Sequence, residues 1–148
     1  MKESEQLELK RSTSELKEGI ISIVAILNKH RKGELYFGVN PKGEVIGQFV
    51  TLKTIRDVSK SISDHIEPKI FPKINVVGLE GKNCIQIEFS GENVPYYASG
   101  RAYMRVGDED KKISPQELEK LILKKKKNLW EEEISEKTIT EVNEEAVR

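Results

Sequence analysis

The stretch that most constrains the fold is the helical pattern between residues 12 and 27, because it is apolar on more than one face. Ser12 and Glu15 have the spacing of a capping box, which predicts a helix that starts here and runs to about Leu27. The apolar residues of its main face are Leu16, Ile20, Ile23, Val24 and Leu27, and those that widen it are Ile21, Ala25 and Ile26. We therefore expect this helix to pack on more than one side.

Strand-like and helical segments surround this helix in a regular order. Residues 6–10, 34–39, 44–48, 73–79, 83–89 and 101–106 have the pattern of strands. Asn40-Pro41-Lys42-Gly43 supplies turn residues that would join the second and third strands as a hairpin. Apolar spacing predicts a helix over 51–66, and Ser114-Pro115-Gln116-Glu117 begins another that should continue to about Lys126. The order β-α-ββ-α-ββ-β-α predicts an α+β fold with a mixed, largely antiparallel sheet and about three packed helices.

Charge divides the chain into two parts. The whole sequence is neutral, with 25 Lys and Arg residues against 25 Asp and Glu residues. Residues 128–148 alone have a net charge of −5, which leaves +5 on residues 1–127. We predict one basic domain over 1–127 and an acidic, partly ordered tail over 128–148 that could link to a C-terminal region. A basic domain permits binding to a polyanion without proving it.

Several classes of protein are disfavoured by the sequence. The single cysteine, Cys84, lies in an alternating segment and should be a buried strand residue, so no intrachain disulfide is expected. No apolar run approaches the roughly 20 residues of a membrane span, and no signal-peptide core is present, so we expect a soluble cytoplasmic protein. Phosphate-binding glycine motifs are absent, and His30 and His65 are too few for a histidine metal cluster. His65 should be solvated.

A basic corner, Lys29 to Lys32, follows the first helix and precedes the strand that starts near Glu34. It could present cations to phosphates, with further basic residues nearby, or it could be a solvated loop whose cations complement the helix C-terminus. Arg101 and Arg105 are the next candidates because their even spacing would place them on one strand face. The full set of candidate nucleic-acid-binding residues is Lys10, Arg11, Lys29, Arg31, Lys32, Lys42, Arg101 and Arg105.

Glu3, Glu5 and Glu8 are spaced along an extended segment. Carboxylates in this arrangement could hold Mg²⁺ or Mn²⁺ if a third oxygen ligand approached them. The alternative is that they are ordinary surface charges.

Five sequence pieces in a fixed order resemble the Schlafen AlbA-type domain family, over roughly residues 2–125. They are Glu3-Ser4 with Glu8-Leu9-Lys10, the run from Asn28 to Val39, Val45-Ile46-Gly47, Tyr103-Met104-Arg105-Val106-Gly107, and Ser114-Pro115-Gln116-Glu117-Leu118. This family is described as DNA-binding and was once labelled a divergent ATPase domain. The resemblance implies a nucleic-acid-binding α+β module of bacterial and archaeal transcriptional regulators, commonly joined to a winged-helix or ATPase-like region.

The resemblance also implies where a nuclease centre would lie. Nuclease members of the Schlafen group use two glutamates and an aspartate to bind metal, and the match places these at Glu3, Glu8 and Asn40. Asn40 has no negative charge, and Lys32-Gly33 replaces the two glycines common in the family. Both departures favour binding without cleavage, so we expect no catalytic residues, no metal and no cofactor.

Three hypotheses follow. The leading one is a DNA- or RNA-binding module of a transcriptional regulator that contacts phosphates without cleaving the chain. The second is a metal-dependent endoribonuclease that uses Mg²⁺ or Mn²⁺ at Glu3, Glu8 and Asn40. The third is a protein-interaction or oligomerisation module, for instance a homodimer.

Overall fold

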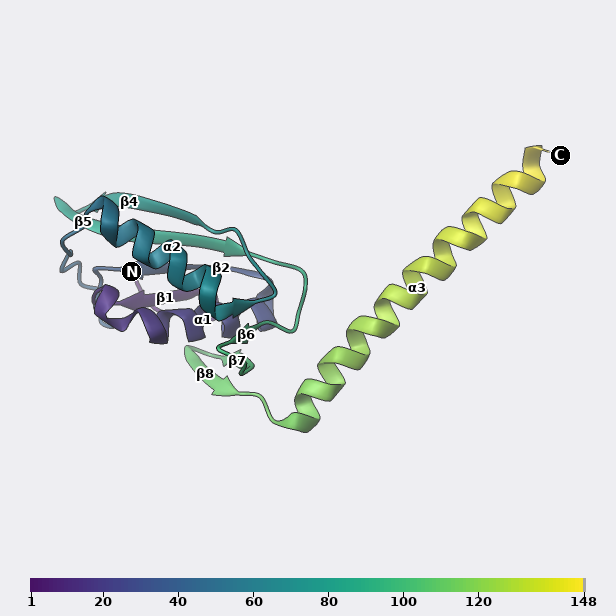
Figure 1. Ribbon diagram of the computed structural model, residues 1–148, viewed down its shortest axis with the longest axis horizontal. Helices are drawn as coiled ribbons and strands as arrows, with labels where there is room; N and C mark the ends of the chain where they lie inside the picture. Colours follow the sequence, from purple (N-terminus) through teal and green to yellow (C-terminus); the bar gives the residue numbers. More distant parts are fainter. Residues whose placement is uncertain (148) are drawn as a thin grey trace. The chain divides into compact units, whose positions relative to one another are not determined.

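The computed structural model describes the backbone of residues 1–147 and the side chains of residues 1–133. The chain forms two compact units, one over Met1–Ile113 and one from Ser114 onward, and each is described by itself. The first unit contains all of the strands, which form a four-stranded sheet and two small two-stranded sheets. The α+β class predicted from the sequence is confirmed (Figure 1).

The four-stranded sheet has the order β1-β2-β5-β4. Its strands are β1 (Leu7–Lys10), β2 (Lys32–Phe37), β4 (Lys73–Leu79) and β5 (Lys82–Ser90). The β1 and β2 strands are parallel, whereas β2 with β5 and β5 with β4 are antiparallel. The sheet is therefore mixed and largely antiparallel, as predicted. The small sheets pair β3 (Ile66–Glu67) with β6 (Tyr97–Ala98) and β7 (Tyr103–Val106) with β8 (Glu109–Lys112).

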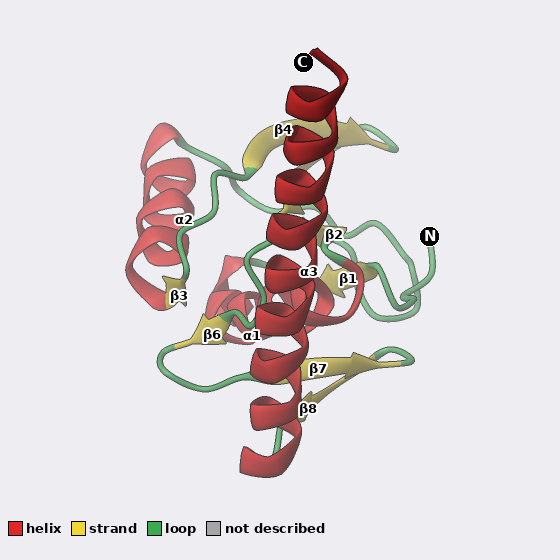
Figure 2. Ribbon diagram, turned by 90° about the vertical axis from the view of Figure 1, so that its right-hand side faces the viewer, coloured by secondary structure: helices red, strands yellow, loops and turns green. Residues whose placement is uncertain are grey.

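The helix α1 (Leu16–His30) is packed on two sides. It lies between the four-stranded sheet and the β7–β8 hairpin, and most of its residues from Gly19 to Asn28 are buried (Figure 2). Ser12 caps a short 3₁₀ turn, η1 (Thr13–Glu15), that leads into the helix, because its hydroxyl accepts from the Ser14 amide. The expectation of a helix that packs on more than one side is confirmed, although the helix runs three residues beyond Leu27.

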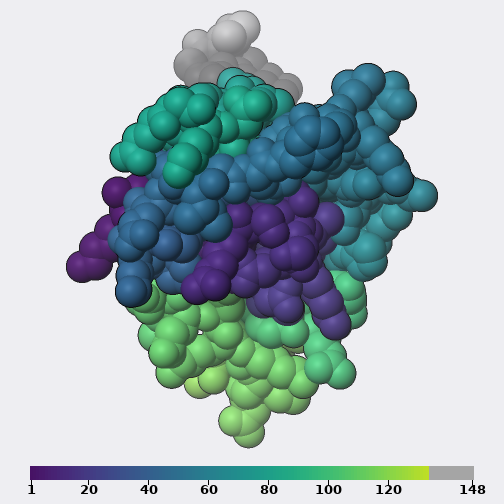
Figure 3. Space-filling view, turned by 90° about the vertical axis from the view of Figure 1, so that its left-hand side faces the viewer, coloured from purple at the N-terminus to yellow at the C-terminus, as the bar shows by residue number. Residues whose placement is uncertain are grey.

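The main hydrophobic core fills the space between the sheet and its two helices. From the sheet come Leu35, Phe37, Ile85 and Ile87, and they meet Ile23, Val24 and Leu27 of α1. The helix α2 (Leu52–His65) adds Val58 and Ile62. Figure 3 shows the layers from one side, with the β4–β5 end of the sheet above the start of α1 and the β7–β8 hairpin below it. A smaller core on the other face of the sheet contains Leu9, Val39 and the buried Cys84, as predicted for this cysteine.

The predicted hairpin after β2 is reduced to a single bridge between Val39 and Val45. Gly38 has a φ of 106°, and its carbonyl accepts from the amides of both Ile46 and Gly47 at 2.9 and 2.8 Å. The chain thus folds back onto Gly38 as a loop instead of forming a regular strand over 44–48. The β2 strand pairs with β1 and β5 instead, two partners distant in the sequence from the turn.

The third helix, α3 (Pro115–Val147), is longer than predicted. Ser114 caps it, since its hydroxyl accepts from the Glu117 amide at 3.2 Å. The helix does not end near Lys126, because no Gly or Pro follows Pro115 and the segment is rich in helix-forming Glu, Lys and Leu. It runs through the predicted boundary at 127, and Arg148, the last residue of the predicted tail, lies outside the described residues. No helix over 1–147 is long and apolar enough to cross a membrane.

Candidate functional site

The two glutamates at the predicted nuclease position lie close together. Glu8 is 4% exposed, and its carboxylate lies 3.2 Å from the Lys10 ammonium and 2.7 Å from the Arg105 guanidinium. Burial and the neighbouring Glu8 carboxylate raise the pKa of Glu3 to about 7. Glu3 and Glu8 therefore form a pair in which one carboxyl group retains its proton up to neutral pH.

Arg105 is an interior ion, which contradicts the expectation that it shares an exposed strand face with Arg101. Its side chain is 0% exposed and lies 2.7 Å from Asp110 as well as from Glu8. It also donates to the backbone carbonyl of Ser4 at 2.8 Å. The strand pattern does not extend back to Arg101, because that residue closes a tight turn by bridging to Ala98 and β7 begins only at Tyr103. Arg105 cannot reach a phosphate in this structure.

Asn40 uses its side chain inside its own turn. Its amide oxygen accepts from the backbone amides of Lys42 and Glu44 at 3.0 and 2.9 Å. Glu8, the more buried of the two glutamates, is already neutralised by two cations. Among residues 1–133, no three His, Cys, Asp or Glu side chains are grouped so as to hold a metal. The residues present therefore do not fit a divalent ion, and we derive no catalytic step from them.

The basic corner is not a loop. Lys29 and His30 belong to the last turn of α1, and Lys32 is the first residue of β2. Arg31 has a left-handed φ of 71°, and its guanidinium folds back to donate to the Asn28 carbonyl at 2.8 Å, which satisfies a free carbonyl at the helix end. His30 pairs with Glu5 at 2.9 Å. Arg31 thus complements the helix C-terminus, whereas Lys29 and Lys32 are exposed.

The remaining predicted cations lie elsewhere. Arg11 and Lys42 are exposed beyond the C-terminal ends of β1 and β2, where Lys10 is paired with Glu8. Five residues of β2 separate that end from Lys32, a distance of about 16 Å at the usual rise of a strand. Arg101 lines a separate pocket of about 570 Å³ together with His65, which is exposed as expected. The predicted set is therefore dispersed, and only Lys29 and Lys32 remain together in the corner.

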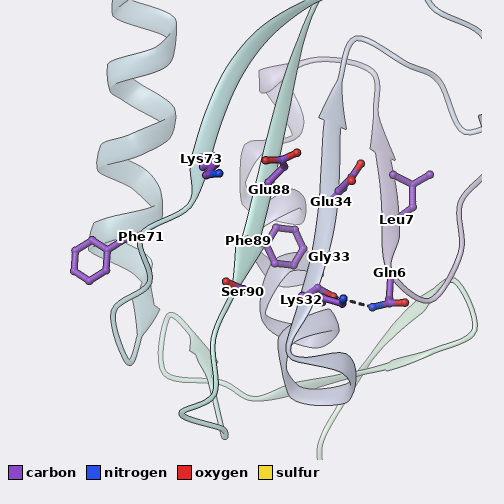
Figure 4. Close-up of a pocket in the computed structure, with 10 residues that line it drawn as sticks. All are labelled: Gln6, Leu7, Lys32, Gly33, Glu34, Phe71, Lys73, Glu88, Phe89 and Ser90. Carbon is purple, nitrogen blue, oxygen red and sulfur yellow. Dashed lines mark hydrogen bonds between the residues drawn. The ribbon is translucent and has the colours of Figure 1, made fainter.

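A groove of about 640 Å³ opens beside Lys32, across the sheet (Figure 4). Its lining includes Lys32 and Glu34 of β2, Glu88 of β5, Lys73 of β4 and the side chain of Phe71. Phe71 is 94% exposed, the most exposed of the large hydrophobic residues described. Neither Lys32 nor Lys73 belongs to an ion pair among the side chains described.

The floor of the groove is one row of side chains across all four strands. Register pairs Leu7 with Glu34, Glu34 with Glu88, and Glu88 with Lys73. Paired residues share a face, so this row lies on the face opposite the main core. In the next row, the Tyr36 hydroxyl donates to Glu34 at 3.1 Å and accepts from Gln86 at 2.8 Å. Burial and the adjacent Glu34 carboxylate raise the pKa of Tyr36, which keeps its hydroxyl protonated as a donor.

Sequence reasoning did not identify Phe71, Lys73, Glu34 or Glu88 as site residues. The sequence around each of them is that of an ordinary strand or strand end. Only the pairing of β2, β5 and β4 brings them together. The one local signal was Phe71 itself, an aromatic residue between Ile70 and Pro72 and directly before the strand that begins at Lys73. No local signal marks the two glutamates.

Lys32-Gly33 stands where the family commonly has two glycines, and the structure shows which of the two positions requires glycine. A Cβ at this position would lie 2.6 Å from the Ile26 side chain and 2.9 Å from the Gln6 carbonyl oxygen, so a larger residue does not fit. Lys32 is exposed and tolerates a side chain. Of the two glycines common in the family, only the second is sterically required here.

Comparisons with known proteins agree with this fold. The DIP2311 protein from Corynebacterium diphtheriae has a similar structure, with a TM-score of 0.58 and 16% identity, over 74% of this chain and 22% of that one. The N-terminal domain of a RecG-related protein from Nitrosomonas europaea matches with a TM-score of 0.54 and 22% identity, over 77% of this chain and 86% of that one. At these identities the likeness concerns the fold alone. The search of curated proteins found no match.

The sequence model of one protein family matches most of the first unit. It is the family described as Schlafen, AlbA_2, and the match covers residues 3–114. This range contains the Glu3 and Glu8 pair, the basic corner, the groove and the interior Arg105. The chain belongs to the Schlafen, AlbA_2 family.

Proposed function

We propose that residues 1–113 bind DNA or RNA through lysine contacts to phosphates, without cleaving the nucleic acid. In this proposal they are a module of a cytoplasmic transcriptional regulator. The observation that carries the proposal is the pair of exposed lysines, Lys32 and Lys73, on a groove whose lining includes an exposed aromatic ring. Free lysines near an aromatic side chain are the usual components of a nucleic-acid surface. Lys29, in the last turn of α1 and three residues before Lys32 in the chain, is also exposed.

Family membership and one structural neighbour support the same class of ligand. The neighbour from Nitrosomonas europaea is named as related to an ATP-dependent DNA helicase. Its likeness to this chain lies in the fold, and from its name we take only the class of ligand, nucleic acid. The same module could be followed by a winged-helix or ATPase-like region in a longer protein.

Binding without cleavage is supported by the state of the acidic pair. A metal-dependent nuclease needs ionised carboxylates that are free to ligate. Here Glu8 is held by Lys10 and Arg105, Glu3 has a pKa of about 7, and Asn40 adds no charge. No cofactor is needed for the proposed activity.

The test is a binding titration followed by fluorescence anisotropy, with mixed-sequence DNA and RNA over a salt series, with and without Mn²⁺. Lys32→Ala/Lys73→Ala should weaken binding and flatten the plot of log affinity against log salt by roughly 0.7 to 0.9 for each lost phosphate contact. The matched control is Lys60→Ala/Lys112→Ala, two exposed lysines on α2 and β8 outside the groove. No binding by the wild type, or an equal loss in both double variants, would refute the proposal. Mn²⁺-dependent products from the pure protein would favour the endoribonuclease.

A further inference from the structure

We propose that the groove takes single-stranded nucleic acid, with a base stacked on Phe71 and base amino groups donating to the carboxylates of Glu34 and Glu88. This inference rests on the proposed function and adds to it the form of the ligand and a preference among bases. It depends on three features: the position of Phe71, the pairing of the two glutamates, and the lysines that flank them.

Phe71 is held outward by its neighbours. Ile70, before it, is 9% exposed and packs in the main core, and Pro72, after it, restricts the backbone. The ring is 94% exposed, so it has both faces available. Figure 4 shows it on the segment that leads into β4, outside the row of side chains on the sheet. An exposed aromatic ring on a groove that also carries two lysines is suited to stacking on a base, since every base has a π-face.

Glu34 and Glu88 are directly opposite each other on the antiparallel strands β2 and β5. Like charges in this arrangement are unfavourable for the sheet, and of the residues in the groove only Lys73, opposite Glu88 on the other side, offsets them within the row. Ionised carboxylates only accept hydrogen bonds, and among the side chains described only the Tyr36 hydroxyl, from the next row, donates to one of them, Glu34. A ligand with N–H groups would donate hydrogen bonds to these carboxylate oxygens.

The charge pattern selects between duplex and single strand. A duplex presents phosphates on its outside and keeps its base edges in the grooves, so the paired carboxylates of the floor would face phosphates and repel them. A single strand can turn its bases toward the floor while its phosphates follow Lys32 and Lys73. The groove volume of about 640 Å³ is within the usual range for small-ligand pockets.

The same chemistry predicts a base preference. Cytosine carries an amino group that donates to a carboxylate, whereas the corresponding position of a uracil or thymine is a carbonyl oxygen that only accepts. Cytosine and uracil are otherwise similar in size. We therefore expect oligo-dC to bind more tightly than oligo-dU of the same length.

The experiment measures the affinity of the full chain for fluorescent dC and dU ten-mers and for a dC·dG duplex, at pH 8 and one salt concentration. The wild type should bind dC at least fivefold more tightly than dU, and the single strands more tightly than the duplex. Phe71→Ala should weaken binding to both single strands by at least fivefold. Glu34→Gln/Glu88→Gln should bring the dC to dU ratio close to one without lowering affinity for dU, because a glutamine can also donate to a carbonyl oxygen.

The control for net charge is Glu80→Gln/Glu92→Gln, which removes two exposed carboxylates away from the groove. It should raise affinity for both single strands alike and keep the wild-type ratio. A wild-type ratio near one, equal or tighter binding of the duplex, or an unchanged ratio in Glu34→Gln/Glu88→Gln would overturn the inference and leave the proposed function standing. No binding to any of the three ligands would refute the proposed function itself.

Discussion

Removing the interior charge of Arg105 should strongly destabilise the first unit. Arg105→Met keeps most of the side-chain volume but removes two ion pairs of 2.7 Å and the hydrogen bond to the Ser4 carbonyl. It leaves Glu8, 4% exposed, and Asp110 without their common partner. Breaking a buried ion pair from one side typically costs about 3–5 kcal/mol.

The expected cost lies at the lower end of that range. Lys10 still lies 3.2 Å from Glu8, and the Ser22 hydroxyl still donates to Asp110 at 2.5 Å. We therefore expect the free energy of unfolding to fall by about 3 kcal/mol. With a urea m-value of about 2 kcal/mol/M for a unit of this size, the midpoint should fall by roughly 1.5 M.

The assay is urea unfolding followed by circular dichroism, with two comparison variants. Arg101→Met removes an exposed arginine and should change stability by less than about 0.5 kcal/mol. Adding Glu8→Gln to Arg105→Met should recover at least about 1 kcal/mol, because the uncompensated carboxylate is then removed. If Arg105→Met unfolds at the wild-type midpoint but loses affinity for nucleic acid, the assignment of Arg105 as an interior structural ion is refuted.

Three further predictions concern the acidic pair and the packing of β2. The pKa of Glu3 is raised to about 7 in the folded protein, so the free energy of unfolding falls as the pH rises from about 4.5 to 7. Glu3→Gln should therefore stabilise the protein by about 1–2 kcal/mol at pH 8 and have no effect below pH 4. Urea midpoints measured at both pH values test this. If position 40 converges with Glu3 and Glu8, Asn40→Asp should raise Mn²⁺ affinity several-fold by calorimetry, because one carboxylate oxygen can keep the turn bonds and the other is free. An unchanged titration would mean that Asn40 serves only its own turn and does not converge with the glutamates. Gly33→Ala should cost about 1–3 kcal/mol of unfolding free energy through overpacking against Ile26, whereas Gly78→Ala, with open space around it, should not destabilise; equal midpoints for the two variants would contradict the packing assignment.

Local patterns were sufficient to predict most of the elements. The apolar spacing of α1 and α2, the alternation of β4 and β5, the cap at Ser114, and the burial of Cys84 all depend on residues close together in the chain. The predicted capping box was wrong, because Ser12 caps the 3₁₀ turn and the Glu15 carboxylate accepts from the Arg11 amide. Family resemblance added the position of Glu3, Glu8 and Asn40. The end of α3 was predicted too early because its acidic half lacks apolar periodicity, although it contains no helix breaker.

Only the tertiary structure decided which side chains meet. The parallel pairing of β1 with β2 places Arg11 and Lys42 at one end of the sheet and Lys32 at the other, and the burial of Arg105 depends on Glu8, about one hundred residues away. The groove requires Glu34, Glu88 and Lys73 to share a row, which follows from strand order and register. Helix and strand formation are governed by periodicities that a short segment displays by itself, whereas strand order and register are set by contacts between segments far apart in the chain. The sequence therefore determined most of the elements and the basic character of the domain, and the packing of those elements determined which charges are structural and which face a ligand.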